Sequence, residues 1–378
     1  MQKNDNNRKA LALHKKLGGK IRITPAMPIQ SRAELSLVYT PGVAAVSSLV
    51  AKNPKLARDY TIKGKMIAVI SDGSAVLGLG NIGPYGALPV MEGKAALFKT
   101  FANVDAFPIV LDTKSIDEVV ETVVRIAPAF GGINLEDFKA PECFEIEERI
   151  KAALDIPVMH DDQHGTAIAV LAALLNASKV VKKDVKKLKV VVVGAGAAGT
   201  AITKLFIKAG IKDCTVLDSK GIIDSSRKEA HKKELASMTN PRKIAGGLRE
   251  ALMGSDVLIG VSGPGLITAK DIAYMAKGAI VFAMANPVPE ILPEEAKAGG
   301  AAVVGTGRSD YPNQINNSLV FPGVFKGALQ NKVTKITDDM KLKAAKNLAA
   351  LVKKPTKEKI VPGAFEKGIA EAVAKAIR

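Results

Sequence analysis

The sequence has no tryptophan, an aromatic content of only 4% and two cysteines among its 378 residues. Because 47% of the residues are nevertheless hydrophobic, aliphatic side chains must fill the cores. Cys143 and Cys214 belong to no paired metal or redox motif, which is typical of reduced thiols. No uninterrupted apolar run is long enough to span a bilayer, and residues 1–7 lack the apolar core of a signal peptide. We therefore expect a cytoplasmic protein with no membrane partner.

The net charge of +17 raises the question of nucleic acid. Lysines are spread along the whole chain, however, and alternate with acidic residues. The densest basic run, 179–189, holds six lysines and leads directly into a predicted buried strand, which indicates a solvated helix end and loop. We expect no nucleic-acid partner, although a positive field would attract anionic substrates and a polyanionic cofactor.

Strands alternate with helices in two blocks, and the length predicts two or three domains. The first block has predicted strands at 65–71, 106–111 and up to His160, with helices at 84–103 and 115–126. An Ala- and Leu-rich helix at 163–181 joins the blocks. The second block has predicted strands at 188–193, 214–218, 256–261, 279–283 and 302–304, with helices between them. Such alternation is typical of parallel sheets with right-handed crossovers, so the fold class is α/β.

A dinucleotide-binding signature opens the second block. The buried strand 190–193 runs into a glycine-rich turn, Gly194-Ala195-Gly196-Ala197-Ala198-Gly199, and a helix follows. In a GxGxxG turn of this kind the glycines permit the tight turn, the approach of the pyrophosphate and close helix–strand packing. The alternative is a purely structural glycine turn, but the preceding strand and the following helix favour dinucleotide binding.

Asp218 ends the next predicted strand and could accept hydrogen bonds from the adenosine ribose. A carboxylate there would repel a 2′-phosphate, which favours NAD over NADP. Lys220, two residues on, could counter that repulsion, so NADP stays possible.

Two pairs of acidic residues each follow a predicted strand end: Glu136 with Asp137, and Asp161 with Asp162. Ligand sites in open α/β sheets form at the carboxyl ends of strands. Oxygen ligands without cysteine or a histidine pair suit Mg²⁺ or Mn²⁺. Either pair alone would suggest helix capping or a solvated loop, but the two together favour a metal site. His160 and His164 could also be ligands, but packing or hydrogen bonding nearby is the expected role of both.

Lys94 and Tyr39 are candidates for a base and an acid. Lys94 interrupts an otherwise apolar helix, where it is either a snorkelling surface residue or a buried base beside the carboxylates. Tyr39 precedes the turn 40–42, which would present its hydroxyl; a structural tyrosine at a turn is the alternative.

Long strings of this sequence resemble the malic enzymes, and the resemblance covers nearly the whole chain. They are Tyr39-Thr40-Pro41-Gly42-Val43-Ala44, the glycine-rich stretch 71–83, Met91-Glu92-Gly93-Lys94, Asn134-Leu135-Glu136-Asp137, His160-Asp161-Asp162-Gln163-His164-Gly165-Thr166-Ala167, Ala285-Asn286-Pro287 and Asn316-Asn317. The length is similar to that of the short bacterial members.

The resemblance implies a role for each matching residue. Tyr39 is the expected general acid and Lys94 the expected general base, supported by Asp161. The expected metal ligands are Glu136, Asp137 and Asp162. The expected substrate and nicotinamide contacts are Asn286 and Asn317. The sequence departs from the larger eukaryotic members at Ala75, where they carry an arginine that grips the substrate carboxylate, so another lysine or a backbone N–H must replace it.

The implied organisation has three parts. Residues 1–160 form a substrate and metal domain, residues 161–315 a doubly wound, Rossmann-type domain that binds NAD(P), and residues 316–378 a helical segment that packs back on the catalytic domain. A homodimer is expected.

The implied reaction is the oxidative decarboxylation of (S)-malate to pyruvate through bound oxaloacetate. It requires a neutral Lys94, so we expect the site to lower the pKa of this lysine. A malolactic enzyme, which retains NAD and releases lactate, and a metal-dependent oxaloacetate decarboxylase are the alternatives. A non-catalytic dinucleotide sensor would not need the lysine and the carboxylates, and an amino-acid dehydrogenase would not need the carboxylate cluster.

Overall fold

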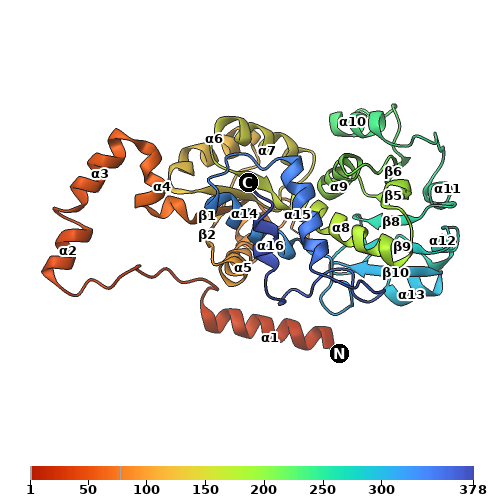
Figure 1. Cartoon of the computed structure of the whole chain (residues 1–378), viewed down its shortest axis with the longest axis horizontal. Helices are drawn as coiled ribbons and strands as arrows, with labels where there is room; N and C mark the ends of the chain where they lie inside the picture. The colour runs from red at the N-terminus through yellow and green to blue at the C-terminus, as the bar shows by residue number, and fades with distance from the viewer. Residues whose placement is uncertain (1, 77) are drawn as a thin grey trace.

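The computed structural model describes residues 2–76 and 78–378, with side chains from residue 6 onward. Leu77, in the glycine-rich stretch 71–83, lies outside the described residues. Two separate sheets make up the body of the molecule, which confirms the α/β class (Figure 1).

The first sheet is entirely parallel and has the strand order β2-β1-β3-β4. Its strands are β1 (Met66–Ser71), β2 (Asp105–Val110), β3 (Gly132–Leu135) and β4 (Val158–His160). Its helices are α5 (Gly83–Ala102), α6 (Ile116–Ile126) and α7 (Glu142–Ala153). The chain passes from β1 to β2 on one side and places β3 on the other, so the strand order reverses beside β1. A ligand site is expected at the carboxyl ends of the strands at such a switch point.

The second sheet has the order β10-β9-β8-β5-β6-β7, with only β7 antiparallel to its neighbour among the described strands. Its strands are β5 (Lys189–Val193), β6 (Asp213–Asp218), β7 (Gly221–Ile222), β8 (Val257–Gly260), β9 (Ala279–Ala283) and β10 (Ala301–Thr306). Its helices are α9 (Ala197–Lys208), α10 (Ala230–Met238), α11 (Leu248–Leu252), α12 (Ala269–Ile272) and α13 (Pro293–Ala298). Here the strand order reverses beside β5, next to the glycine-rich turn.

Helix α8 (Asp161–Val180) joins the two sheets, and its middle part, residues 167–174, is buried and carries only apolar side chains. Ile168, Leu171 and Leu174 are among its buried residues and belong to one hydrophobic cluster that continues into both sheets. Each such side chain contributes about 1.5–3 kcal/mol by its burial. The shared core fixes the N-terminus of α8, where Asp161 and Asp162 lie, against both halves of the molecule.

The C-terminal segment adds α14 (Phe321–Gln330), α15 (Asp338–Ala350) and α16 (Ile369–Ala374). Helix α14 contacts α5 and β3, and α15 contacts α8 and α9. Helix α16 begins directly after Gly368, which adopts a left-handed conformation. Short 3₁₀ turns occupy Pro54–Leu56, Ile62–Gly64, Ala127–Ala129, Val185–Lys187 and Asn317–Leu319.

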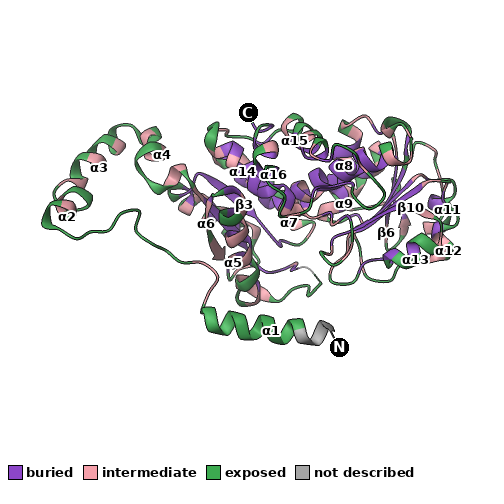
Figure 2. Cartoon of the chain, turned by 60° about the horizontal axis from the view of Figure 1, so that its bottom comes forward, coloured by how far each residue is buried: buried purple, intermediate pink, exposed green. Residues whose placement is uncertain are grey.

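The N-terminal region projects from the body as an arm, defined here as residues 20–64. It follows α1 (Gln2–Leu17) and contains α2 (Arg32–Val38), α3 (Val43–Lys52) and α4 (Ala57–Tyr60). None of these three helices has a buried residue, and Figures 1 and 2 show α2 and α3 far from both sheets. Helices α2 and α3 therefore gain little stability from contacts with the rest of their own chain. The ends of the arm do contact the body, for example through the Lys63 ammonium, which donates to the Ala127 and Phe130 carbonyls.

One stretch of the described residues, Arg32–Lys52, is long and apolar enough to cross a membrane by length and composition alone. A single such stretch near the N-terminus is weak evidence for a membrane span. In the structure it comprises α2, a turn and α3 rather than one continuous helix.

Candidate active site

A cluster of carboxylates gathers at the carboxyl edge of the first sheet. Glu136 and Asp137 follow β3, and Asp162 lies in the first turn of α8, directly after β4. Because β3 and β4 are parallel neighbours, their carboxyl ends meet at one edge. One ligand oxygen from each of these three residues lies within 4.8 Å of the others, a spacing that could hold a metal ion.

The donor set fits a hard divalent cation. Burial, together with the nearby charge of Asp162, raises the pKa of Asp137 to about 8 and also raises that of Glu136. The Oδ2 atom of Asp137 is buried and has no hydrogen-bond partner. Clustered, buried and incompletely paired carboxylates are unfavourable without a cation, and an all-oxygen set suits Mg²⁺ or Mn²⁺.

Neighbouring groups fix the orientation of these carboxylates. The backbone N–H of Asp137 donates to Asp162 Oδ2 at 2.8 Å, and the Asn134 amide donates to Glu136 Oε2 at 3.0 Å. Asp137 adopts a left-handed backbone conformation with φ of 55°, which is uncommon for a residue other than glycine and frequent at functional sites. Asn134 was not among the residues singled out as a site residue.

Lys94 lies beside the cluster, where it is only 7% exposed on α5. Its ammonium donates to Glu136 and, at 2.5 Å, to Asp161 Oδ2, and lies 4.4 Å from the centre of the Phe321 ring. Lys94 is therefore a buried residue of the cluster and not a snorkelling surface lysine.

The expectation of a lowered pKa for Lys94 is wrong for this arrangement. Burial alone would lower the pKa, but the charges of Asp161, Glu136 and Asp162 together outweigh burial and raise it. A divalent cation held by Glu136 and Asp162 would oppose their effect, since a bound ion is the largest local charge in such a site.

Asp161 is completely buried and supports Lys94 from the start of α8. A Cβ atom added at Gly165 would lie 1.8 Å from Asp161 Oδ1, so only glycine leaves room for this carboxylate. This explains why a glycine follows the acid pair in the string 160–167.

The two histidines of that string have different surroundings. The His160 ring is buried with no hydrogen-bond partner among the described residues on either nitrogen, and its Nε2 lies 3.7 Å from Asp162 Oδ2. His164 Nε2 lies 3.0 Å from Glu147 Oε2, and the backbone N–H of His160 donates to Glu147 Oε1 at 2.8 Å. Side-chain hydrogen bonding, one expected role, is therefore found for His164, and packing, the other, for the buried His160 ring. Glu147 itself, a buried carboxylate on α7, was missed, because no motif surrounds it and α7 was not predicted.

Tyr39 is not brought to this cluster within one chain. It lies on the arm, between α2 and α3, and is 66% exposed. Lys94 is buried in the body, from which the arm projects (Figure 1). The expected acid and base are therefore separated in the isolated chain.

The glycine-rich stretch does not offer its Ala75 backbone N–H to a substrate, because that N–H donates to the Asp137 carbonyl at 2.8 Å. This removes one candidate for the group that replaces the arginine of the larger eukaryotic family members.

The dinucleotide signature folds as a strand, a tight turn and a helix. Gly194 has φ of +118°, and a Cβ atom at Gly199 would lie 1.8 Å from the Gly194 carbonyl oxygen. The turn runs through Gly194, Ala195, Gly196, Ala197, Ala198 and Gly199, and α9 begins within it. The close approach of α9 to β5 therefore requires glycine at both ends of this motif.

Asp218 lies at the end of β6, but its surroundings differ from the expectation. Arg227 Nη2 lies 3.0 Å from Asp218 Oδ1, and Lys232 Nζ lies 3.1 Å from Oδ2. The exposed Lys220 contributes only its backbone N–H, which donates to Asp218 at 2.8 Å. The side chains of Arg227 and Lys232, which belong to no motif, thus face the Asp218 carboxylate, whereas the Lys220 side chain does not.

A cavity of about 250 Å³ connects the two halves of the candidate site. Asp162 of the carboxylate cluster lines it, as do Asn286 and Asn317. Val261, Ser262, Met284 and Ala285, at the carboxyl ends of β8 and β9, line it as well. A substrate held at the carboxylates would therefore face the dinucleotide half of the molecule.

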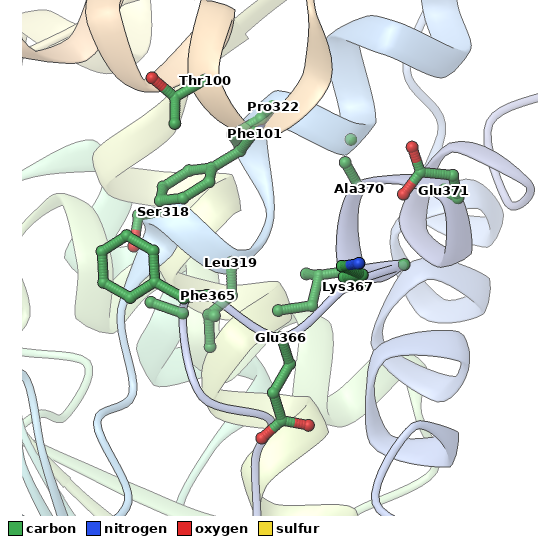
Figure 3. A pocket seen from close by; sticks show the side chains of 14 residues that line it. Thr100, Phe101, Ser318, Leu319, Pro322, Phe365, Glu366, Lys367, Ala370 and Glu371 are labelled. Carbon is green, nitrogen blue, oxygen red and sulfur yellow. The ribbon is translucent and has the colours of Figure 1, made fainter.

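A second cavity, of about 550 Å³, lies between α5, α14 and the segment 364–371 (Figure 3). The rings of Phe101 and Phe365 lie on one side of it, 5.7 Å apart, and Glu371 on the other. Its lining includes none of the residues that the motifs assign to chemistry, so it is distinct from the candidate site.

Two family models match this chain: the malic enzyme N-terminal domain over residues 18–151, and the malic enzyme NAD-binding domain over residues 163–377. The chain is 52% identical to an NAD-dependent malic enzyme of Geobacillus stearothermophilus, over 96% of this chain and 76% of that protein. It is 51% identical to a bifunctional malic/malolactic enzyme of Bacillus subtilis, over 97% and 91% of the two chains. The crystal structure of an NAD-dependent malic enzyme from Thermotoga maritima matches with a TM-score of 0.94 and 47% identity, over 97% and 98% of the two chains.

Proposed function

This chain belongs to the malic enzyme family, and from that premise we propose that it converts (S)-malate to pyruvate and CO₂ with reduction of NAD(P). The observation that carries the proposal is Lys94, buried between Glu136 and Asp161 beside three clustered carboxylates. The lysine could act as a base next to a cation site, and the cavity at this site reaches the dinucleotide-binding half of the molecule. This arrangement suits the oxidation of a hydroxy acid.

Glu136, Asp137 and Asp162 would hold Mg²⁺ or Mn²⁺. When bound, the cation acts as a Lewis acid that polarises the substrate oxygens, and NAD(P) accepts the hydride. Lys94, once neutral, accepts the proton of the 2-hydroxyl group as the C2–H bond breaks, which leaves oxaloacetate. Asp161 holds the resulting ammonium in place.

The second half of the reaction breaks the C3–C4 bond, releases CO₂ and leaves the enolate of pyruvate. Tyr39 then donates its proton to C3 and so forms pyruvate. Asn286 and Asn317, which line the connecting cavity, would orient the substrate toward the nicotinamide.

A second copy of the chain would supply Tyr39. Two observations support this proposal. Tyr39 is exposed on the arm while Lys94 is buried in the body, and the arm also exposes apolar side chains, including Leu35 and Leu37. Placing the arm against a partner would cover those side chains and complete the site, in a symmetric dimer with two shared sites.

NAD is the proposed cofactor, with NADP also accepted. Asp218 can accept hydrogen bonds from the adenosine ribose, as NAD binding requires. Arg227 and Lys232 already face that carboxylate, so both could move to a 2′-phosphate.

Malolactic activity is the second candidate, because one relative at 51% identity is named a bifunctional malic/malolactic enzyme. One experiment separates the two reactions. Purified protein is mixed with (S)-malate and Mn²⁺, with NAD or with NADP, and organic acids and cofactor absorbance are followed together with a chelator control. Pyruvate with reduced cofactor, abolished by the chelator, supports the proposed reaction. Lactate without reduced cofactor would establish the malolactic reaction, and no turnover would refute both.

A further inference from the structure

Glu290 is a completely buried carboxylate that joins two loops of the second sheet. Its Oε1 accepts hydrogen bonds from the Ser262 N–H at 2.7 Å and the Ser262 hydroxyl at 3.3 Å. Its Oε2 accepts from the Ala285 N–H at 3.1 Å. Ser262 follows β8 and Ala285 follows β9, so one side chain ties together the carboxyl ends of two neighbouring strands.

These two loops form one wall of the cavity of about 250 Å³ that reaches Asp162. Ser262, Ala285 and Asn286 all line it. Since β8 pairs directly with β5, which carries the glycine-rich turn, this wall lies at the switch point of the sheet. A dinucleotide bound at that turn would place its nicotinamide end along this wall.

The hydrogen-bonding pattern requires a carboxylate and not merely a polar residue. Both oxygens accept from backbone N–H groups, which cannot turn away. A glutamine amide would keep the size of the side chain but would set an NH₂ group against one of the two N–H donors. A Cβ atom at Gly260, the last residue of β8, would lie 2.6 Å from Glu290 Cδ. Glycine at this position therefore leaves room for the Glu290 side chain.

Among the residues that the structure describes, none forms an ion pair with this acid. Burial raises the pKa of Glu290, and the groups that oppose the rise are neutral donors of Ser262, Ala285 and the backbone of Glu290 itself. Burying a carboxylate against neutral donors alone is costly, and such a cost is characteristic of functional sites.

We propose that Glu290 is a positioning residue that holds the Ser262 and Ala285–Asn286 loops as the nicotinamide wall of the site. This inference rests on the proposed function, because it assigns the wall to the cofactor of that reaction. Glu290 touches neither substrate nor reacting atoms in this role. Its effect should therefore be much larger on steps that need the dinucleotide than on steps that do not.

The test compares Glu290→Gln with the wild-type enzyme loaded with Mn²⁺. We expect the KM for NAD to rise about tenfold, the consequence of one unsatisfied buried hydrogen bond. Affinity for NADH, titrated by its fluorescence, should fall to a similar extent. Decarboxylation of added oxaloacetate without any dinucleotide depends on the carboxylate cluster and on this wall only through Asn286, so it should change much less. Glu294→Gln, at an exposed position of the neighbouring α13, is the matched control and should alter none of these values.

An unchanged KM for NAD in folded Glu290→Gln would overturn the proposal. So would a parallel loss of cofactor affinity and oxaloacetate decarboxylation, which would indicate a structural role alone. If Glu290→Gln does not fold, the Glu290→Asp variant tests the proposal instead. It keeps two acceptor oxygens but is too short to reach both loops, so it should raise the KM for NAD while sparing decarboxylation. If the wild-type protein oxidises no malate, the proposed function fails, while the NADH titration still tests Glu290.

Discussion

The Lys94 ammonium lies 2.5 Å from the Asp161 carboxylate, and both side chains are buried. Glu136 contacts the same ammonium, and Asp137 and Asp162 lie close by. The charges of Asp161, Glu136 and Asp162 raise the pKa of Lys94 and keep it protonated, whereas the proposed reaction needs it neutral. A divalent cation would offset much of this negative charge, so metal binding and the basicity of Lys94 are expected to be linked.

Replacing either member of the proposed acid–base pair should reduce malate oxidation severely. We expect Lys94→Ala and Tyr39→Phe each to lower kcat about 10²- to 10⁴-fold, the range typical of a lost general acid or base. The two variants should differ in a partial reaction. Reduction of oxaloacetate needs Lys94 but not the protonation of C3, so Tyr39→Phe should retain more of it. Lys99→Ala, at an exposed position on the same helix, serves as the control, and equal losses in the partial reaction would contradict these roles.

Mixing the two inactive variants tests whether Tyr39 acts across a dimer. In a heterodimer of Lys94→Ala and Tyr39→Phe chains, one shared site would contain both wild-type residues and the other neither. Random pairing of co-expressed chains should therefore restore about a quarter of wild-type activity, given two shared sites per dimer. Heterodimers isolated by means of two different tags should have about half of the wild-type activity. Activity that stays at the level of the separate variants would show that Tyr39 and Lys94 of one chain work together.

Arg227 should influence the choice of cofactor. Arg227→Ala removes one cation that could pair with a 2′-phosphate, so the KM for NADP should rise about tenfold while that for NAD changes much less. The matched control is Lys220→Ala, because the Lys220 side chain is exposed and only its backbone bonds to Asp218. A larger effect from Lys220→Ala than from Arg227→Ala would contradict this assignment.

Much of the second sheet could be predicted from the sequence, because its buried strands are continuous apolar runs next to glycine turns. Strands β5, β6, β8 and β9 were predicted to within two residues of their observed ends. The carboxylate cluster was predictable for a related reason. Parallel strands place their carboxyl ends at one edge, so residues 136–137 and 161–162 meet although they are distant in sequence.

Other features depend on contacts that leave no local pattern. Glu147, Arg227 and Glu290 lie in no motif, and their partners are far along the chain or on a neighbouring loop. The sign of the pKa shift of Lys94 was predicted wrongly, since burial and the opposing charges could be weighed only after their distances were known. The position of Tyr39 on an exposed arm likewise depends on the absence of packing partners, which a turn motif does not reveal.

Metal binding should stabilise the protein more as the pH rises. The folded pKa of Asp137 is about 8, against an ordinary value of 3.8, so between these values the metal-free folded chain keeps a proton that the unfolded chain has lost. The stability that this group contributes is therefore present at low pH and lost as the pH rises toward 8. A cation must displace that proton, which makes its binding weaker at low pH. Thermal unfolding with and without Mn²⁺ should show a shift in Tm that grows between about pH 5 and pH 8. Asp137→Asn should abolish most of the shift, and the exposed Asp155→Asn should leave it intact. A shift of constant size across this range would mean that Asp137 is already ionised without the metal.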